Sequence, residues 1–370
     1  MSTREFRNDD FRMLSRPDYF ALLAKELSRL HTGDRAVVMT MGLTPTTPEV
    51  GAVVTSMNQA AKQGADVSLI MDAFDFLING DTKVPGPLWL SSRLDFDRRM
   101  WEPFNAKLKT LQQFSLNGVR HTVTNQPGKT FVWPFVGRSH IKVAIVNDVI
   151  YMGGCNLNNP HELDIMLRWH DPKTANWLYQ LLLDIEKVGS VRKSLHDKDI
   201  MRKLGSKTTL YIDAGVQKQS AIFDEALSMI DNAKEWIVFT SQYFAPGLGI
   251  KALDRALKRG VKITYYYSHH SMHGPIEGPL HRIAQWRERR RLPAALFEKR
   301  LPKGQHLHAK ILATENGVLI GSHNYGDMGV NSGTAEIAMK RNDVAFGKRA
   351  VAFIENLINE EKTINKREKH

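Results

Sequence analysis

Apolar and polar residues follow two periods along this chain, one typical of helices and one typical of buried strands. Leucine and tyrosine side chains recur at helical spacing over residues 17–31, and an apolar run over 35–43 predicts a strand. A helix from about Pro48, a glycine cap at Gly64 and a second buried strand over 67–71 follow. This order of elements predicts an α/β unit.

The same order of elements returns in the second part of the chain. The pattern predicts a helix over 217–233, a strand over 235–241, a helix over 248–259 and a strand over 261–267. Each copy then has a hairpin, a further strand (163–169; 334–339) and a closing helix (172–188; 343–360). We therefore infer an internal duplication, broken near 190–206, with one half over 1–205 and the other over 206–370.

The two predicted halves differ in length. Asp72 and His140 are 68 residues apart (140 − 72), whereas Ser268 and His308 are 40 apart (308 − 268), so the first half carries about 28 extra residues. We place this insertion at about 77–118 and expect it to contain a helix that packs on the first half. The alternative is an amphipathic lid beside the site, in contact with an apolar substrate or a bilayer surface.

Each half contains one hairpin that begins with histidine and lysine two residues apart. The first motif, 140–156, reads HIKVAIVNDVIYMGGCN, and the second motif, 308–324, reads HAKILATENGVLIGSHN. In both copies an asparagine stands sixteen residues after the histidine (156 − 140; 324 − 308). Because residues i and i+2 of a strand share a face, each histidine and its lysine can converge on one point. Two accidental copies with matching internal spacing are improbable.

These residue types match the needs of phosphodiester cleavage. One neutral histidine can attack phosphorus and become phosphohistidine, while a protonated one gives its proton to the leaving oxygen and then deprotonates water or an alcohol. The candidate catalytic residues are His140, His308, Lys142 and Lys310. The candidates for holding the phosphate oxygens are Asn156, Asn324 and Ser322. This chemistry requires no metal, and we expect no cofactor.

Each catalytic histidine also needs an acceptor for its other ring nitrogen, to fix the tautomer and the orientation of the ring. Asp164 and Glu336 are the candidates, because each stands at the start of the strand that follows its motif. The paired placement favours orienting carboxylates over carboxylates at the surface ends of strands.

These residues resemble the phospholipase D superfamily, whose motif is His-x-Lys, four residues, Asp, about six residues and Gly-Ser-x-Asn, usually twice per chain. The string SQYFAPGLGIKALDRALKRGVKITYYYS is similar to bacterial cardiolipin synthase-like members. The resemblance implies an α/β fold in which two α/β/α sandwich halves meet about a pseudo-two-fold axis, with one active site between them. It also implies a phosphohistidine on the first motif, so we expect His140 as nucleophile and His308 as acid.

The chain departs from the superfamily pattern at three positions. The motif aspartate is replaced by Asn147 in the first copy and by Glu315 in the second, and Gly154 replaces the first serine. The motif aspartate mainly serves the structure around the site, so the histidine, lysine and asparagine set remains complete. Tyrosyl-DNA phosphodiesterases also lack this aspartate, so nucleic acid remains an alternative substrate class.

Composition changes this picture mainly through charge. The net charge of +12 and the pI near 9.6 favour an anionic partner, which phospholipid headgroups or nucleic acid would satisfy. We interpret the basic string 286–291 and the basic tail as solvated faces. The single cysteine, the polar N-terminus and the lack of an apolar run of about 18 residues or more favour the cytoplasm, with peripheral contact at the inner face of the membrane.

Three functions are consistent with these observations. The leading hypothesis is a phosphatidyltransferase or phospholipase D acting on an anionic phospholipid, with cardiolipin synthesis as its most specific form. The second is a nuclease or DNA-end phosphodiesterase with the same two-histidine site. The third is an inactive lipid- or nucleic-acid-binding homologue. The choice of water or alcohol, the headgroup and the oligomeric state stay open.

Overall fold

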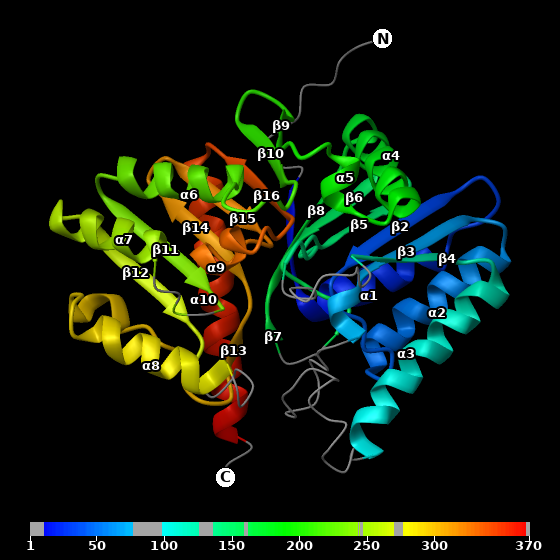
Figure 1. Ribbon diagram of the computed structural model, residues 1–370, viewed down its shortest axis with the longest axis horizontal. Helices are drawn as coiled ribbons and strands as arrows, with labels where there is room; N and C mark the ends of the chain where they lie inside the picture. The colour runs from blue at the N-terminus through cyan, green and yellow to red at the C-terminus, as the bar shows by residue number, and fades with distance from the viewer. Residues whose placement is uncertain are drawn as a thin grey trace.

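Two mixed seven-stranded sheets, one in each half of the chain, form the frame of the molecule (Figure 1). The computed structural model describes residues 11–76, 98–125, 136–158, 162–242, 244, 247–269 and 277–367. The first sheet has the order β1-β8-β6-β5-β2-β3-β4. Its strands are β1 (Arg12–Ser15), β2 (Arg35–Thr40), β3 (Asp66–Asp72), β4 (Arg120–Thr124), β5 (Val143–Val146), β6 (Val149–Gly153) and β8 (Ile165–His170).

The second sheet repeats this arrangement. Its order is β12-β11-β14-β15-β16-β10-β9. Its strands are β9 (Ile200–Lys203), β10 (Thr208–Asp213), β11 (Trp236–Ser241), β12 (Lys262–Tyr267), β14 (Lys310–Thr314), β15 (Gly317–Gly321) and β16 (Glu336–Arg341). The run β8-β6-β5-β2-β3 corresponds strand for strand to β16-β15-β14-β11-β12. The predicted duplication and the α/β fold are confirmed.

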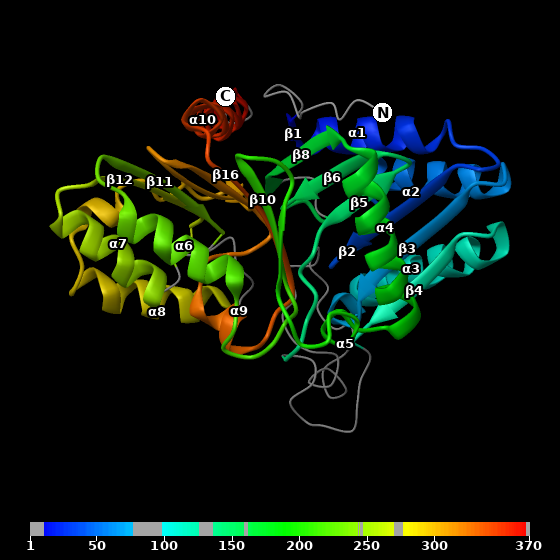
Figure 2. The same cartoon turned by 90° about the horizontal axis from the view of Figure 1, so that it is seen from above.

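Helices cover both faces of each sheet (Figure 2). The longer ones are α1 (Arg16–Leu27), α2 (Pro48–Lys62), α3 (Arg98–Asn117), α4 (Pro172–Val188), α6 (Ala221–Asn232), α7 (Leu248–Lys258), α8 (Glu277–Arg289) and α10 (Val344–Arg367). The shorter ones are η1 (Ala73–Phe76), α5 (Val191–Ser194), η4 (Ala294–Phe297) and α9 (Asp327–Asn331). Helices α1 and α2 share a core with the first sheet, and α6 and α7 share one with the second.

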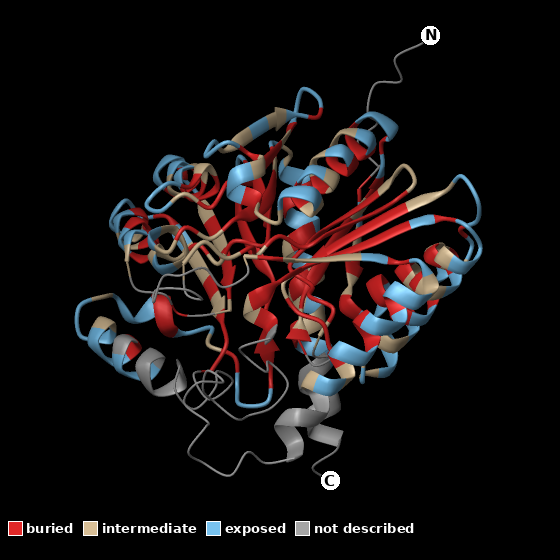
Figure 3. Cartoon of the chain, turned by 45° about the vertical axis from the view of Figure 1, so that its right-hand side comes forward, coloured by how far each residue is buried: buried red, intermediate tan, exposed pale blue. Residues whose placement is uncertain are grey.

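A third hydrophobic core joins the two halves. It contains Ile145 and Leu182 from the first half together with Ile311 and Ile354 from the second. Figure 3 shows the buried strands at the centre and the exposed faces of the helices outside them. Two short strands, β7 (Glu162–Leu163) and β13 (His306–Leu307), also pair in parallel between the halves. The halves are therefore packed into one body, which fixes the residues at their junction.

Local sequence signals explain where several helices begin and end. Ser15, Asp171 and Ser220 each cap a helix by accepting a backbone N–H in its first turn. Gly189 ends α4 in the left-handed conformation at φ 71°, which glycine adopts without steric cost. Helix α4 accordingly has the bounds that the pattern predicted.

The insertion and the region between the halves contain structure that the sequence pattern indicated only in part. Helix α3 packs on α2, and its residue Phe114 is fully buried, as expected for a packed helix. The earlier part of the insertion, 77–97, lies outside the described residues. The region 190–206 contains α5 and β9, and β9 pairs with β10 at the edge of the second sheet. No helix in the described ranges is both long and apolar enough to cross a bilayer.

Candidate active site

Two histidines, one from each half, face each other where the halves meet. His140 and His308 each lie just before the first strand of the central hairpin of their half. Their ring centroids are 6.4 Å apart, with an angle of 71° between the ring planes. Rings at this separation can contact one phosphodiester from two sides, as a nucleophile and a general acid must. The fold therefore brings together histidines that are 168 residues apart in the chain (308 − 140).

The orienting carboxylates are exchanged between the halves. Both carboxylate oxygens of Glu336 lie 3.0 Å from Nδ1 of His140, and Oδ2 of Asp164 lies 2.5 Å from Nδ1 of His308. Each histidine is thus held by the carboxylate of the other half. A contact at Nδ1 leaves Nε2 of each ring available for chemistry at phosphorus. The predicted pairing of two histidines with two carboxylates is present, and the crossing was not foreseen.

Backbone hydrogen bonds fix the same junction. The N–H of His140 donates to the carbonyl of Ala335 at 2.8 Å, and the N–H of His308 donates to the carbonyl of Leu163 at 2.8 Å. Ala335 and Leu163 are the residues directly before the two carboxylates in the chain. The backbone that carries each histidine is therefore tied to the backbone that carries its acceptor, which restricts both rings.

Each histidine motif is also held by the end of a neighbouring parallel strand. The carboxylate of Asp72, the last residue of β3, accepts the N–H of Ser139 at 2.6 Å. Ser268 follows β12, and its hydroxyl accepts the N–H of Leu307 at 2.8 Å and donates to the carbonyl of that residue. Ser139 and Leu307 directly precede the two histidines. The sequence indicates that Asp72 and Ser268 are equivalent only when strands β3 and β12 are aligned.

The two motif lysines are buried beside their own histidines. Lys142 is 1% exposed and Lys310 is 0% exposed. Nζ of Lys142 donates to the carbonyl of His140 at 2.8 Å, and Nζ of Lys310 donates to the carbonyl of His308. Burial lowers the pKa of Lys142 to about 7 although the Glu336 carboxylate opposes this shift, and burial also lowers the pKa of Lys310. An anion bound between the halves would favour the charged form of both ammonium groups.

The motif asparagines share one feature, a buried side-chain oxygen. The side-chain oxygens of Asn156 and Asn324 are buried, and neither has a hydrogen-bond partner within the described part of the chain. A buried amide oxygen without a hydrogen-bond partner costs free energy. This observation is consistent with the predicted role of both amides as ligands of a substrate, which stays a prediction.

Serine and glycine occupy the equivalent motif position in the two halves. The hydroxyl of Ser322 donates to Glu336 and accepts the N–H of Ile337 at 3.0 Å. At Gly154, an added Cβ would lie 2.1 Å from Oδ1 of Asp164. In the structure Ser322 therefore contacts the carboxylate of Glu336. Its contact with phosphate stays a prediction. The glycine leaves the space that the shorter aspartate needs.

A second carboxylate, which the sequence analysis missed, lies beside His308. Oε2 of Glu162 is 3.8 Å from Nδ1 of His308 and 3.3 Å from Nη1 of Arg16, and Oε1 is 3.8 Å from Nδ1 of His306. The equivalent residue beside His140 is Thr334, two positions before its carboxylate as Glu162 is before Asp164. The string HELD over residues 161–164 could have indicated it, because Glu162 and Asp164 share one face of a strand. The environments of the two histidines therefore differ in charge.

Burial has the largest effect on the pKa of both histidines. It lowers the pKa of His140 well below its usual value, and the nearby charges of Lys142, Lys310 and Arg138 lower it further. Burial also lowers the pKa of His308, followed by the charge of Lys310, whereas the Glu162 carboxylate raises it. A bound phosphodiester would add negative charge near both rings and raise both pKa values.

Three residues of this site form a group with ligand types that metals bind. Ligand atoms of Glu162, Asp164 and His308 lie within 4.8 Å of one another. Arg16 already pairs with Glu162, and Nδ1 of His308 already contacts Asp164. The three side chains therefore satisfy one another, and we interpret the group as an orienting network for His308.

The residues that replace the motif aspartates brace the fold away from the histidines. Oδ1 of Asn147 accepts the N–H of Arg35, the first residue of β2, at 3.0 Å. The carboxylate of Glu315 accepts the N–H of Lys234 at 2.7 Å and that of Trp236, the first residue of β11, at 3.4 Å. Both side chains tie the turn of the central hairpin to the start of the adjacent strand. The structural role expected for this motif position is thus retained in both halves.

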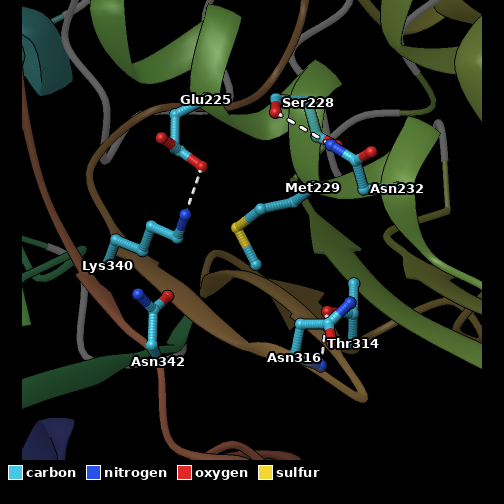
Figure 4. Close-up of a pocket in the computed structure, with 8 residues that line it drawn as sticks. All are labelled: Glu225, Ser228, Met229, Asn232, Thr314, Asn316, Lys340 and Asn342. Atoms are coloured by element: carbon cyan, nitrogen blue, oxygen red, sulfur yellow. Dashed lines mark hydrogen bonds and ion pairs between the residues drawn. The ribbon is translucent and has the colours of Figure 1, made fainter. Parts of the chain in front are cut away.

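A small pocket lies at this turn end of the second hairpin, away from the two histidines. It has a volume of about 90 Å³. It is lined by Glu225, Ser228, Met229, Asn232, Thr314, Asn316, Lys340 and Asn342 (Figure 4). The ammonium of Lys340 pairs with Glu225 at 2.6 Å across it. The pocket contains none of the predicted site residues, and we assign it no catalytic role.

The fold and the site define a class of protein: a duplicated α/β protein with two His-x-Lys motifs that meet between its halves. A family model described as "Cardiolipin synthase, PLD-like domain" matches residues 226–358, which include the second motif. No curated protein sequence matches the chain significantly.

Two solved structures share the fold. Phosphatidylserine synthase from Haemophilus influenzae Rd KW20 has a TM-score of 0.69 at 12% identity, over 96% of this chain and 87% of that one. Polyphosphate kinase from Porphyromonas gingivalis has a TM-score of 0.55 at 14% identity, over 93% of this chain. The present chain spans 50% of the length of that kinase. The domain match over residues 226–358 and the shared fold of the whole chain support the resemblance to the phospholipase D superfamily.

Proposed function

We propose that this protein cleaves or transfers the phosphodiester of an anionic phospholipid through a phosphohistidine intermediate. The observation that carries the proposal is the pair of facing histidines, 6.4 Å apart, each oriented at Nδ1 by a carboxylate of the opposite half. Two buried lysines hydrogen-bond to the carbonyls of these histidines, which supports an anionic reacting group between the rings.

The proposed reaction has two steps. In the first, Nε2 of His140 attacks phosphorus, the bond to the leaving oxygen breaks, and His308 gives its proton to that oxygen. In the second, His308 takes a proton from water or an alcohol, whose oxygen then attacks phosphorus. The P–N bond breaks and returns His140 to its neutral form. Water yields a hydrolase, and an alcohol such as the headgroup of a second lipid yields a transferase.

The charges around the two rings support this division of roles. His140 must be neutral to attack, and the positive charges of Lys142 and Arg138 disfavour its protonation. His308 must carry a proton, and Glu162 adds a negative charge near its ring beyond that of Asp164. Glu162 therefore adds to the asymmetry between the two histidines, beside Arg138 near His140 and His306 near His308.

The lipid substrate is supported by the family description, which names a cardiolipin synthase-like domain, and by the net charge of +12. A nuclease would use the same histidines and would also suit a basic protein. An inactive homologue is less consistent with the complete histidine, lysine and asparagine sets of both halves. These alternatives are therefore the arms of the test.

The test incubates the protein with phosphatidylglycerol vesicles, and separately with labelled single-stranded DNA, with and without EDTA. The matched variants are His140→Ala and, as a control, His170→Ala, which alters an exposed histidine outside the site. We expect cardiolipin or phosphatidic acid from the lipid, lost only in His140→Ala and unaffected by EDTA. Cleavage of DNA alone would replace the lipid proposal with the nuclease, and inactivity on both would favour a retired site.

A further inference from the structure

Helix α8 presents an outer face that combines tryptophan, isoleucine and arginine. Ile283, Trp286, Arg287 and Arg290 are spaced i, i+3, i+4 and i+7, so they share one side of the helix, with Arg290 just beyond its last residue. Ile283 is 61% exposed and Trp286 is 56% exposed. The guanidinium of Arg290 lies 3.8 Å from the centre of the Trp286 ring. We call these four residues the α8 face.

The opposite side of α8 is anchored to the second half. Gln285 is buried, and it and Arg289, four residues later, hydrogen-bond with the fully buried Tyr267 at the end of β12. The guanidinium of Arg289 also lies 5.2 Å from the ring centre of Phe297. These contacts fix the rotation of the helix, so its apolar outer residues are held away from the core.

This anchor places α8 near the active site. Tyr267 is followed directly by Ser268, which hydrogen-bonds with Leu307, the residue before His308. The helix is therefore attached to the strand end that positions one catalytic histidine. Figures 1 and 2 show α8 on the outside of the second half.

The composition of this segment is that of a surface that binds anions and apolar groups together. Residues 282–291 contain five arginines and one glutamate, a net charge of +4. Of the four tryptophans whose burial the structure describes (Trp169, Trp177, Trp236 and Trp286), only Trp286 is exposed. A solvated helix face accounts for the arginines, whereas Ile283 and Trp286 add an exposed apolar pair on the same side of the helix.

We propose that the α8 face docks the protein on an anionic phospholipid bilayer. Tryptophan is favoured at the boundary between headgroups and acyl chains, isoleucine gains from contact with the acyl chains, and arginine attracts anionic headgroups. The proposal rests on the proposed function for the identity of the surface, since a lipid substrate resides in a bilayer. Docking beside the site would present the phosphodiester to the two histidines.

The geometry favours a bilayer over a nucleic acid. Arg290 covers one face of the Trp286 ring, which leaves only the other face for the stacking of a base. Ile283 is aliphatic and gains little from a nucleobase, but it gains from hydrocarbon. Binding of single-stranded DNA through the same residues is therefore an outcome that the experiment must detect.

The experiment measures partition of the protein onto vesicles by sedimentation. It uses vesicles of phosphatidylcholine with an equal part of phosphatidylglycerol, and vesicles of phosphatidylcholine alone. All proteins carry His140→Ala, so that binding is measured without turnover. The test variants are Ile283→Ala with Trp286→Ala, and Arg287→Glu with Arg290→Glu. The control variants change exposed residues between the two halves. They are Lys193→Glu with Lys198→Glu, in and after α5, and Met201→Ala, in β9.

We expect the arginine pair variant to lower the partition coefficient on anionic vesicles by at least about 25-fold, about fivefold for each charge lost. The apolar pair variant should lower it at least about tenfold. Both controls should bind like the parent, and all variants should unfold at the parent temperature. Equal binding of the test variants, or equal binding to neutral vesicles, would overturn the proposal.

Binding of labelled single-stranded DNA, measured without vesicles and weakened in the test variants whose vesicle binding is unchanged, would assign the α8 face to nucleic acid instead. The experiment is independent of the proposed activity, because it uses a variant without the nucleophile. Docking with no lipid turnover in the parent protein would retain this inference and reject the function. Turnover without docking at α8 would do the reverse.

Discussion

The two halves of this protein have the same central five strands and the same hairpin motif, yet they do not build equivalent surroundings for their histidines. His308 has two carboxylates near Nδ1, from Asp164 and Glu162, whereas the Nδ1 contact described for His140 is to Glu336. The comparison shows how a duplicated fold can give one histidine the role of nucleophile and the other the role of acid. Strand order sets the symmetry, and a few side chains at the junction break it.

The largest effect is expected from the two histidines themselves. His140→Ala should abolish labelling of the protein by a substrate with radioactive phosphorus, and should lower kcat at least about 10⁴-fold. His308→Ala should lower kcat by about 10²- to 10⁴-fold and still permit labelling, because it removes only the proton transfer. Acid-quenched labelling of both variants is the measurement. Labelling at His308 in the His140 variant would reverse the assigned roles.

The crossed carboxylates should show their effects in the opposite half. Glu336→Gln should slow formation of the phosphohistidine about 10²-fold or more, since it disturbs the orientation and tautomer of His140. Asp164→Asn should impair the proton transfers of His308. Single-turnover rates of labelling and of label release separate these effects. A carboxylate variant that affects the histidine of its own half would contradict the crossing.

The glycine and serine exchange should affect the halves unequally. Gly154→Ser should reduce activity strongly, because its Cβ would overlap the carboxylate of Asp164. Ser322→Gly should have a smaller effect, on the order of 1–3 kcal/mol in stability, because it leaves the buried N–H of Ile337 without its acceptor. Thermal unfolding measured beside kcat distinguishes the two. Equal losses of activity in Gly154→Ser and Ser322→Gly would contradict the inferred difference in space beside Asp164 and Glu336.

The asymmetry of charge should appear in the pH dependence. Burial lowers the pKa of His308 in the free protein, and a bound anion raises it, so the alkaline limb of kcat should lie at higher pH than that of kcat/KM. The charged or titratable groups near this ring are Asp164, Glu162, His140, His306, Lys142 and Lys310.

Glu162→Gln removes one negative charge, lowers the pKa of His308 and should move both limbs to lower pH. The loss of kcat at alkaline pH should be about tenfold. Glu225→Gln is the matched control, since it also breaks an ion pair but lies outside the site. An unchanged alkaline limb in Glu162→Gln would mean that Glu162 only supports the fold around Arg16.

The smallest effect is expected where the halves have both lost the motif aspartate. Asn147→Asp would restore it in the first half, but it would place a carboxylate beside Asp34, whose side chain now accepts from Asn147 at 3.0 Å. We expect a loss of about 1 kcal/mol in stability with kcat unchanged. Urea unfolding and steady-state rates test this. A large change in kcat would show that the position acts on the reaction and not only on the hairpin.

Much of the fold could be read from local pattern. Helix α4, the two central hairpins and the parallel strands β3 and β12 follow from apolar periodicity, glycine caps and turn residues. The edge strands were harder to predict, because β1 and β9 are four residues long and carry little pattern of their own. They form through pairing with β8 and β10, which is a tertiary effect.

The candidate site divides in the same way. The sequence determined the two His-x-Lys motifs, the asparagine sixteen residues after each histidine and the presence of two carboxylates, because spacing within a hairpin is local. Only the tertiary structure decided that Glu336 serves His140 across 196 residues and that Asp164 serves His308 across 144. It also decided that Glu162 and Arg16 stand beside one histidine alone. Contacts between halves depend on how two sheets pack, and no periodicity along a single chain records that packing.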